Sequence, residues 1–359
     1  MFALTELGHG EKADKNTCLY RIERGGVEPF MKNLPKLGAF LVSLALVVGF
    51  STSTSAQEFP VSVDHAFGTT VVEAKPERVA TVAWANHEVP LALGIVPVGF
   101  ARANFGDADG DGVLPWVSEQ LNKLGADIPV LFDEGDGIDF EAVAASQPDI
   151  ILAAYSGLSR SEYDTLSMIA PVIAYRKGPW ATDWREMIRL NAAGLGMSDE
   201  GEDLIDNIDQ EIAEVTSEYP EISGKRAMFV THLDARDLSV IRFYSAEDTR
   251  VQFLDDLGLK SPKSVIDAGE PGKYSGELSA EKIDDLSDVD IFITYGGKAL
   301  VDTVKANPLT SRMKAIDNGA IVLLGNDPVG TAANPTPLSL PWVLKEYVAL
   351  LAEAARKVE

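Results

Sequence analysis

The stretch SDEGEDLIDNIDQEIAEVTSE, residues 198–218, indicates how the chain is organised. Its apolar residues recur at helical spacing and fall on one face: Leu204, Ile205, Ile208, Ile212 and Val215. Ser198 is suited to the N-cap position, and the acidic residues that follow it complement the helix dipole. Pro220 ends the pattern. We predict one amphipathic helix over residues 198–219, about 30 Å long at a rise of about 1.5 Å per residue.

Short apolar runs alternate with segments of helical period on both sides of this helix. Strands are predicted over residues 78–84, 95–100, 148–155, 171–176, 226–233, 238–244, 290–297 and 320–325. Such alternation, with short loops, predicts parallel sheets covered by helices on both faces. The expected fold is α/β: two Rossmann-like lobes, at residues 57–197 and 220–359, joined by a single long backbone helix.

Residues 1–56 form a leader with the pattern of a secretory signal peptide. A short basic stretch begins at Met31, an apolar run follows over residues 37–50, and small residues lead to a cleavage point after Ala56. The apolar run is too short for a typical transmembrane helix. We predict a signal peptide over residues 31–56 and interpret Met31 as the true start of the protein.

Cysteine usage and charge narrow the expected surroundings. The one cysteine, Cys18, lies in the leader, so the mature chain would have none for a disulfide or a lipid anchor. We therefore expect a periplasmic protein without a membrane anchor. The net charge of −24 would repel nucleic acids and anionic membranes, which we exclude as partners. The sequence also lacks a P-loop, a dinucleotide-binding glycine motif and a zinc-protease motif, so no enzyme is predicted.

The stretch DADGDG, residues 107–112, matches the first half of a calcium-binding loop. A complete loop needs a bidentate carboxylate at its twelfth position, which is Ser118 here, and Glu119 comes one residue late. Asp and Gly also favour ordinary turns. We interpret the stretch as a solvated turn and predict no metal site.

Aromatic and arginine residues recur where the predicted strands end. Ligands of open parallel sheets bind beyond the carboxyl ends of the strands. Arginine offers planar donors for oxyanions, and aromatic rings offer rigid apolar walls. The sequence predicts a cleft between the lobes for a bulky ligand with negative oxygens, lined by Trp84, Arg102, Tyr155, Trp180, Arg242, Tyr244, Tyr274 and Tyr295.

Ordered stretches over residues 60–355 resemble the substrate-binding proteins of iron–siderophore ABC importers, the class III periplasmic binding proteins. They include KPERVATVAW, GIDFEAVAASQPDIILAAYSGLS, GPWATDW, LSAEKIDDLSDVDIFI and NPLTSRMKAI. The resemblance implies a monomer without cofactor that captures a ferric siderophore and delivers it to an ABC permease and its ATPase. It also implies that one glutamate on each lobe, Glu141 and Glu281, docks on the permease. Both residues also fit the simpler role of a helix-start carboxylate.

Other ligands remain open on the same fold. A haem or cobalamin binder would share both lobes and have a wider, more apolar cleft. A binder of free metal ions would depend on His87 or His232. A two-lobed enzyme such as a glycosyltransferase needs a nucleotide site, for which the sequence offers no glycine-rich loop. The class of siderophore, whether hydroxamate, catecholate or carboxylate, is also left open.

Overall fold

The computed structural model describes residues 58–231 and 233–358. The predicted signal peptide over residues 31–56 and the predicted start at Met31 lie outside these ranges. So does His232.

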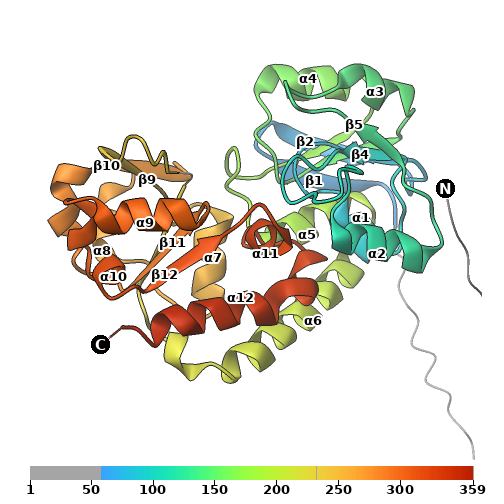
Figure 1. Ribbon diagram of the computed structural model, residues 1–359. Helices are drawn as coiled ribbons and strands as arrows, with labels where there is room; N and C mark the ends of the chain where they lie inside the picture. Colours follow the sequence, from blue (N-terminus) through green and yellow to red (C-terminus); the bar gives the residue numbers. More distant parts are fainter. Residues whose placement is uncertain (1–57, 232, 359) are drawn as a thin grey trace, which may run out of the picture. The chain divides into compact units, whose positions relative to one another are not determined.

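The N-terminal lobe is built on a five-stranded parallel sheet of order β5-β4-β3-β6-β7 (Figure 1). Its strands are β3 (Val79–Thr81), β4 (Gly99–Ala101), β5 (Val130–Phe132), β6 (Ile150–Ala153) and β7 (Val172–Ala174). Its helices are α1 (Glu88–Ala92), α2 (Pro115–Leu124), α3 (Phe140–Ala145), α4 (Arg160–Ser167) and α5 (Trp184–Gly194). A hairpin of β1 (Val61–His65) and β2 (Gly68–Val72) precedes them. Strands β3, β4, β6 and β7 are buried along their whole length, as apolar runs in a parallel sheet require, whereas the edge strand β5 is partly exposed.

The C-terminal lobe has a five-stranded sheet of order β10-β9-β8-β11-β12. Its strands are β8 (Ala227–Val230), β9 (Val240–Tyr244), β10 (Ser275–Ser279), β11 (Ile291–Tyr295) and β12 (Ile321–Leu324). Strands β8, β11 and β12 are parallel as predicted, whereas β9 runs antiparallel to both β8 and β10. Only residues 231–239 separate β8 from β9, which is too short for the crossover that a parallel pair needs.

Short helices surround this second sheet. They are α7 (Thr249–Asp256), α8 (Lys263–Ala268), α9 (Lys298–Ala306), α10 (Lys314–Asp317) and α11 (Pro328–Ala332), with the 3-10 segments η1 (Pro220–Ile222), η2 (Ala280–Leu286) and η3 (Thr310–Arg312). The long helix α12 (Ser339–Ala355) ends the chain and buries most of one face.

The predicted connecting helix is α6 (Ser198–Ser217), and the predicted fold class is confirmed. The helix begins at Ser198 with Met197 at the N-cap position, one residue from the cap that the sequence suggested. Its isoleucines are buried in one hydrophobic cluster that includes Trp184 of the first lobe and Phe253 of the second. Figure 1 shows α6 and α12 side by side, and the two helices are in contact. The exact lobe boundaries stay a prediction.

One arginine joins α5 to both α6 and the second lobe. Arg185 of α5 forms ion pairs with Asp209 of α6 and, at 2.8 Å, with Asp256 of α7. The indole nitrogen of Trp184 donates to the same Asp256 carboxylate at 2.9 Å. Three helices from the two lobes and the connector therefore share one set of charges.

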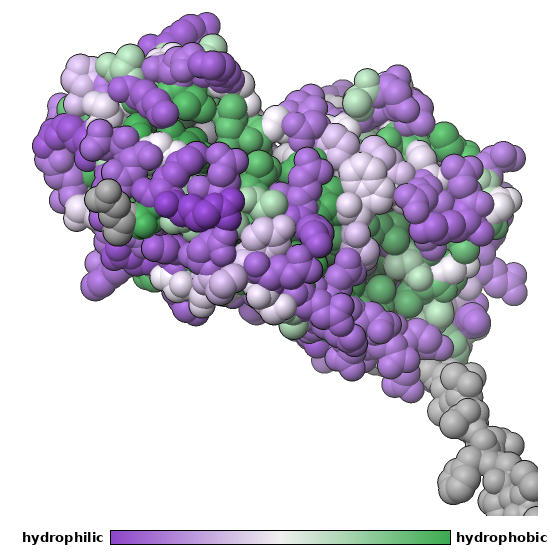
Figure 2. Space-filling view, turned by 60° about the horizontal axis from the view of Figure 1, so that its bottom comes forward, coloured by the Kyte–Doolittle hydropathy of each residue, from purple (hydrophilic) through white to green (hydrophobic). Residues whose placement is uncertain are grey.

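Figure 2 shows polar side chains over most of the face in view, with hydrophobic residues in the recesses between them. Across residues 58–231 and 233–358, no helix has the length and apolar character needed to span a membrane.

After β12 the chain returns to the N-terminal lobe over residues 325–338, which we call the return segment. The backbone N–H of Gly106 donates to Asn326 at 2.6 Å, and that of Leu338 donates to Glu88 at 3.0 Å. Glu88 is fully buried and also accepts a 2.7 Å hydrogen bond from the indole of Trp116. Burial raises the pKa of Glu88 to about 7, despite these hydrogen bonds. The return segment thus docks on a carboxyl group that titrates near neutrality.

The raised pKa of Glu88 makes the unfolding free energy of the protein depend on pH. A raised pKa in the folded state gives stability that is fully present below the ordinary pKa of 4.5 and is lost as the pH rises through about 7. That interval corresponds to about 3 kcal/mol. We expect the unfolding free energy of the wild type, minus that of E88Q, to fall by about 3 kcal/mol between pH 4.5 and pH 8.

Urea unfolding at several pH values measures this difference. Other titrating groups are common to both proteins and cancel in the subtraction. E73Q, a change at an exposed position, is the control and should show no such trend. A difference that is constant with pH would mean that Glu88 is already ionised in the folded protein at pH 5.

Candidate ligand-binding site

A strained turn after β3 presents Trp84 to the space between the lobes. Ala83 and Ala85, on either side of it, both have a φ of 61°, in the left-handed region that costs roughly 1–2 kcal/mol for a residue with a Cβ. Such a turn persists only where its surroundings hold it.

Asn86 holds this turn through both ends of its side-chain amide. Its Nδ2 donates to the carbonyl oxygens of Val82 at 2.9 Å and Tyr155 at 2.8 Å. Its Oδ1 accepts from the N–H of Tyr155 and from the amide of Asn191, each at 3.0 Å. The turn is therefore joined to the end of β6 and to α5, and all of these groups are buried.

A cavity of about 350 Å³ lies beside this turn, with walls from both lobes. Most of its lining is aromatic, and the polar groups are few. The lining residues are Trp84, Asn104, Phe105, Tyr155, Trp180, Tyr244, Asp248, Arg250, Tyr274, Tyr295, Thr331 and Asn334. We call this cavity the aromatic cleft. It brings together six of the eight residues named from the sequence: Trp84, Tyr155, Trp180, Tyr244, Tyr274 and Tyr295.

Rings and hydroxyls of the aromatic cleft contact one another, both within the N-terminal lobe and between its residues and those of the following segments. Tyr155 and Trp180 meet edge to face with centroids 5.3 Å apart. The hydroxyl of Tyr155 lies 3.3 Å from the amide nitrogen of Asn334, which belongs to the return segment. Phe105 and Tyr295, from opposite lobes, also meet edge to face at 5.8 Å. These contacts give the cleft rigid apolar walls.

The cationic group of the cleft is Arg250, which the sequence reasoning missed. Its side chain is 17% exposed and forms an ion pair at 3.0 Å with Asp248, which is 1% exposed. Its Nε donates to the hydroxyl of Tyr295 at 3.3 Å, and its guanidinium lies 4.4 Å from the ring centre of Tyr244. Nη2 has no hydrogen-bond partner within residues 58–231 and 233–358, which leaves it for a ligand.

Arg250 keeps its charge in this setting. Desolvation would lower the pKa of Arg250, but the adjacent Asp248 carboxylate outweighs it and holds that pKa well above the ordinary value. Asp248 also caps α7 by accepting from the backbone N–H of Arg250 at 2.9 Å. The signal in the sequence was the pair Asp248 and Arg250 at the start of a helix that follows a strand.

The two arginines named from the sequence lie elsewhere. Arg242 is 64% exposed on β9, and its Nε is 3.5 Å from the carboxylate of Glu277, directly opposite on β10. It lines neither this cleft nor its neighbour, because the opposite charge holds it on the surface of the sheet. Arg102 lines a second cavity that adjoins the aromatic cleft.

Glu141 and Glu281 are both exposed, each in the first turn of a helix. Asp139 caps α3, and Ser279 caps the 3-10 turn η2 by accepting from the N–H of Glu281. Both positions suit helix-start carboxylates. A role in docking stays a prediction.

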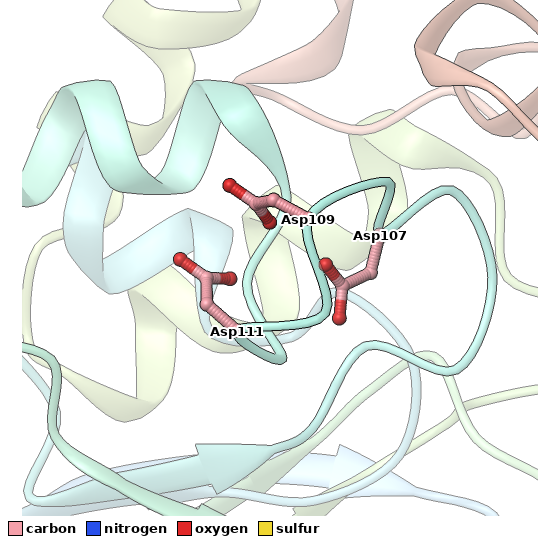
Figure 3. A group of neighbouring side chains, drawn as sticks. All are labelled: Asp107, Asp109 and Asp111. Carbon is pink, nitrogen blue, oxygen red and sulfur yellow. The ribbon is translucent and has the colours of Figure 1, made fainter. Parts of the chain in front are cut away.

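The DADGDG stretch forms a surface loop in which Asp107, Asp109 and Asp111 lie close together (Figure 3). Their carboxylate oxygens lie within 4.8 Å of one another, and no other such group occurs in the described ranges. Asp107 accepts from the N–H groups of Gly110 and Gly112, each at 2.8 Å. These carboxylates therefore shape the turn, and Ser118 lies beyond the loop in α2.

His87 is buried and stacks on Phe100 with centroids 4.3 Å apart. Burial lowers the pKa of His87 to about 3, so the ring is neutral at physiological pH. It belongs to no cluster of three ligating side chains among the residues that the structure describes. The metal-ion alternative thus finds no support at His87, and its other candidate, His232, lies outside those residues.

Known proteins share this architecture and much of the sequence. A family model described as periplasmic binding protein matches residues 79–328. The crystal structure of Streptococcus pneumoniae PiaA in complex with ferrichrome is 43% identical, with a TM-score of 0.80, and the match covers 83% of this chain and 100% of that one.

The chain is also similar in sequence to other binding proteins. A Bacillus subtilis protein named as the probable siderophore-binding lipoprotein YfiY is 25% identical over 285 residues, which cover 77% of this chain and 82% of that protein. The ferric enterobactin-binding periplasmic protein FepB of Escherichia coli is 22% identical over 312 residues, 83% of this chain and 94% of its own. The resemblance found in the sequence is confirmed: the chain belongs to the periplasmic binding protein family.

Proposed function

We propose that this protein is the solute-binding component of an ABC importer, and that it captures a ferric siderophore in the periplasm. It works as a monomer, by binding and delivery without catalysis, and the iron stays within its chelator. The aromatic cleft with its buried arginine carries the proposal. The names of the similar proteins, which bind siderophores or ferric chelates, support it.

The cleft suits such a ligand in shape and charge. A ferric siderophore combines an apolar outer surface with oxygen atoms that carry negative charge around the iron. The rings of Trp84, Trp180 and Tyr274 offer apolar contact to this outer surface. The free Nη2 of Arg250 offers a charge-assisted hydrogen bond to one of the oxygens.

Arg250 should dominate the affinity. R250Q leaves Asp248 buried and unpaired, so the double variant D248N/R250Q, which removes both charges, is needed beside it. We expect each to raise the Kd for a ferric siderophore at least about tenfold, the loss of one charge-assisted hydrogen bond. R242Q is the matched control and should change the Kd less than about twofold, because Arg242 is a surface residue.

Quenching of tryptophan fluorescence measures binding, since Trp84 and Trp180 line the cleft. A panel of ferric hydroxamate, catecholate and carboxylate siderophores, the same compounds without iron, haem and cobalamin distinguishes the ligand classes. A response to haem or cobalamin alone would contradict the proposal. If R242Q raised the Kd as much as R250Q does, the proposed role of Arg250 of α7 as the site for anionic oxygens would be contradicted.

Glu141 and Glu281 should act in delivery. We infer that these exposed carboxylates pair with basic residues of the permease, one from each lobe. The double variant E141A/E281A should bind the siderophore with unchanged Kd but reduce cellular uptake of radioactive iron about tenfold or more. The control is E73A, another exposed glutamate, which should leave uptake intact. Undiminished uptake in E141A/E281A would refute the docking role.

A further inference from the structure

A second cavity, of about 330 Å³, adjoins the aromatic cleft. The two cavities share Trp84, Asn104 and Trp180 in their walls and therefore lie next to each other. This second cavity, which we call the acidic pocket, belongs to the N-terminal lobe alone. It lies among the turns that follow β3, β4, β5 and β6, and its carboxylates are Glu134 and Glu162.

Glu134 is the central polar group of the acidic pocket. It follows β5, it is partly buried, and both of its oxygens face the backbone N–H of Ala83, at 3.0 and 3.2 Å. Within the described ranges it forms no ion pair with a basic side chain. Burial, with smaller repulsion from Asp139 and Glu162, raises the pKa of Glu134 to about 7. When the Glu134 carboxylate is ionised, its negative charge therefore has no basic side chain paired with it among the described residues.

The other charged groups of the acidic pocket do not supply that cation. Arg102 lines it, but its guanidinium packs against the aspartate loop: a Cβ at Gly112 would lie 3.0 Å from the guanidinium carbon. Desolvation would raise the pKa of Asp107, but backbone hydrogen bonds to this carboxylate, together with the charge of Arg102, lower it below the ordinary value. Glu162 adds a second negative charge and is held by the backbone N–H and hydroxyl of Ser159, each at 2.7 Å.

His87, the remaining titratable group in the wall, is neutral because burial lowers its pKa to about 3. The acidic pocket therefore holds two carboxylates, one arginine whose guanidinium lies against the aspartate loop, and two tryptophans in its wall. A desolvated carboxylate and aromatic faces are the two features that bind an ammonium group. Arg250, in contrast, lines the aromatic cleft and not the acidic pocket.

We propose that the acidic pocket binds a positively charged alkylammonium arm of the siderophore, with Glu134 as its partner, while the iron centre occupies the aromatic cleft. This inference rests on the proposed function and narrows it to chelates that carry a pendant cation. The ammonium group would enter past Trp84 and Trp180 and donate to the Glu134 carboxylate. The combined site would then have a negative charge, Glu134, in the acidic pocket and a positive charge, Arg250, in the aromatic cleft.

A matched pair of ligands tests the inference with the full protein. Ferrioxamine B is a trihydroxamate with a pendant primary ammonium, and its N-acetylated form has the same iron centre without that charge. At pH 8, where Glu134 is ionised, we expect the wild type to bind ferrioxamine B about tenfold or more tightly than the acetylated form, as one charge-assisted hydrogen bond implies. E134Q should bind both forms with equal affinity.

The controls separate the possible failures. E134Q keeps an oxygen for the N–H of Ala83, and an unchanged Kd for the acetylated form would show that the variant is folded. E73Q removes the same charge from an exposed position and should keep the preference. Equal binding of both ligands by the wild type, or a preference that survives in E134Q, would overturn this inference alone. If neither ligand binds, the proposed function fails for trihydroxamates, and the inference fails with it.

Discussion

The side-chain amide of Asn86 is the contact on which the ligand site depends. Three of its hydrogen bonds join the turn after β3 to the end of β6 and to α5, deep in the N-terminal lobe, and another, to the carbonyl of Val82, lies within the turn itself. Those bonds hold two alanines in left-handed conformations, and Trp84 lies between them. Because Trp84 belongs to the wall of both cavities, a shift in this one turn would change the aromatic cleft and the acidic pocket together.

The fold was largely predictable because its signals are local. The isoleucine stripe of α6 and the apolar runs of the strands each follow from a few neighbouring residues, and the structure places them within a few positions of the predicted bounds. The direction of β9 was not read from its composition, although the short link from β8 implied it. The return of the chain to Glu88 could not be predicted, because it depends on residues 250 positions apart.

The site was predictable in its aromatic part and not in its charges. Large rings at strand ends fill space wherever they are placed, so Tyr155 and Tyr295 could be named from position alone. An arginine, however, goes where a carboxylate accepts it. Arg242 meets Glu277 across an exposed ladder, whereas Arg250 meets a buried Asp248 two residues before it. Which arginine faces the cleft depends on the burial of its partner, and a sequence does not display burial.

An acidic protein that binds the negatively charged oxygens around a chelated iron needs its positive charge to be local. The chain carries a net charge of −24, which by itself would repel those oxygens. Surface charges act through water and are screened over about 8 Å at physiological ionic strength. Arg250 lies in a largely desolvated wall, where a charge interacts more strongly with a ligand that excludes water. The proposed affinity therefore depends on one buried guanidinium group held by Asp248, and the many surface carboxylates weaken it only slightly.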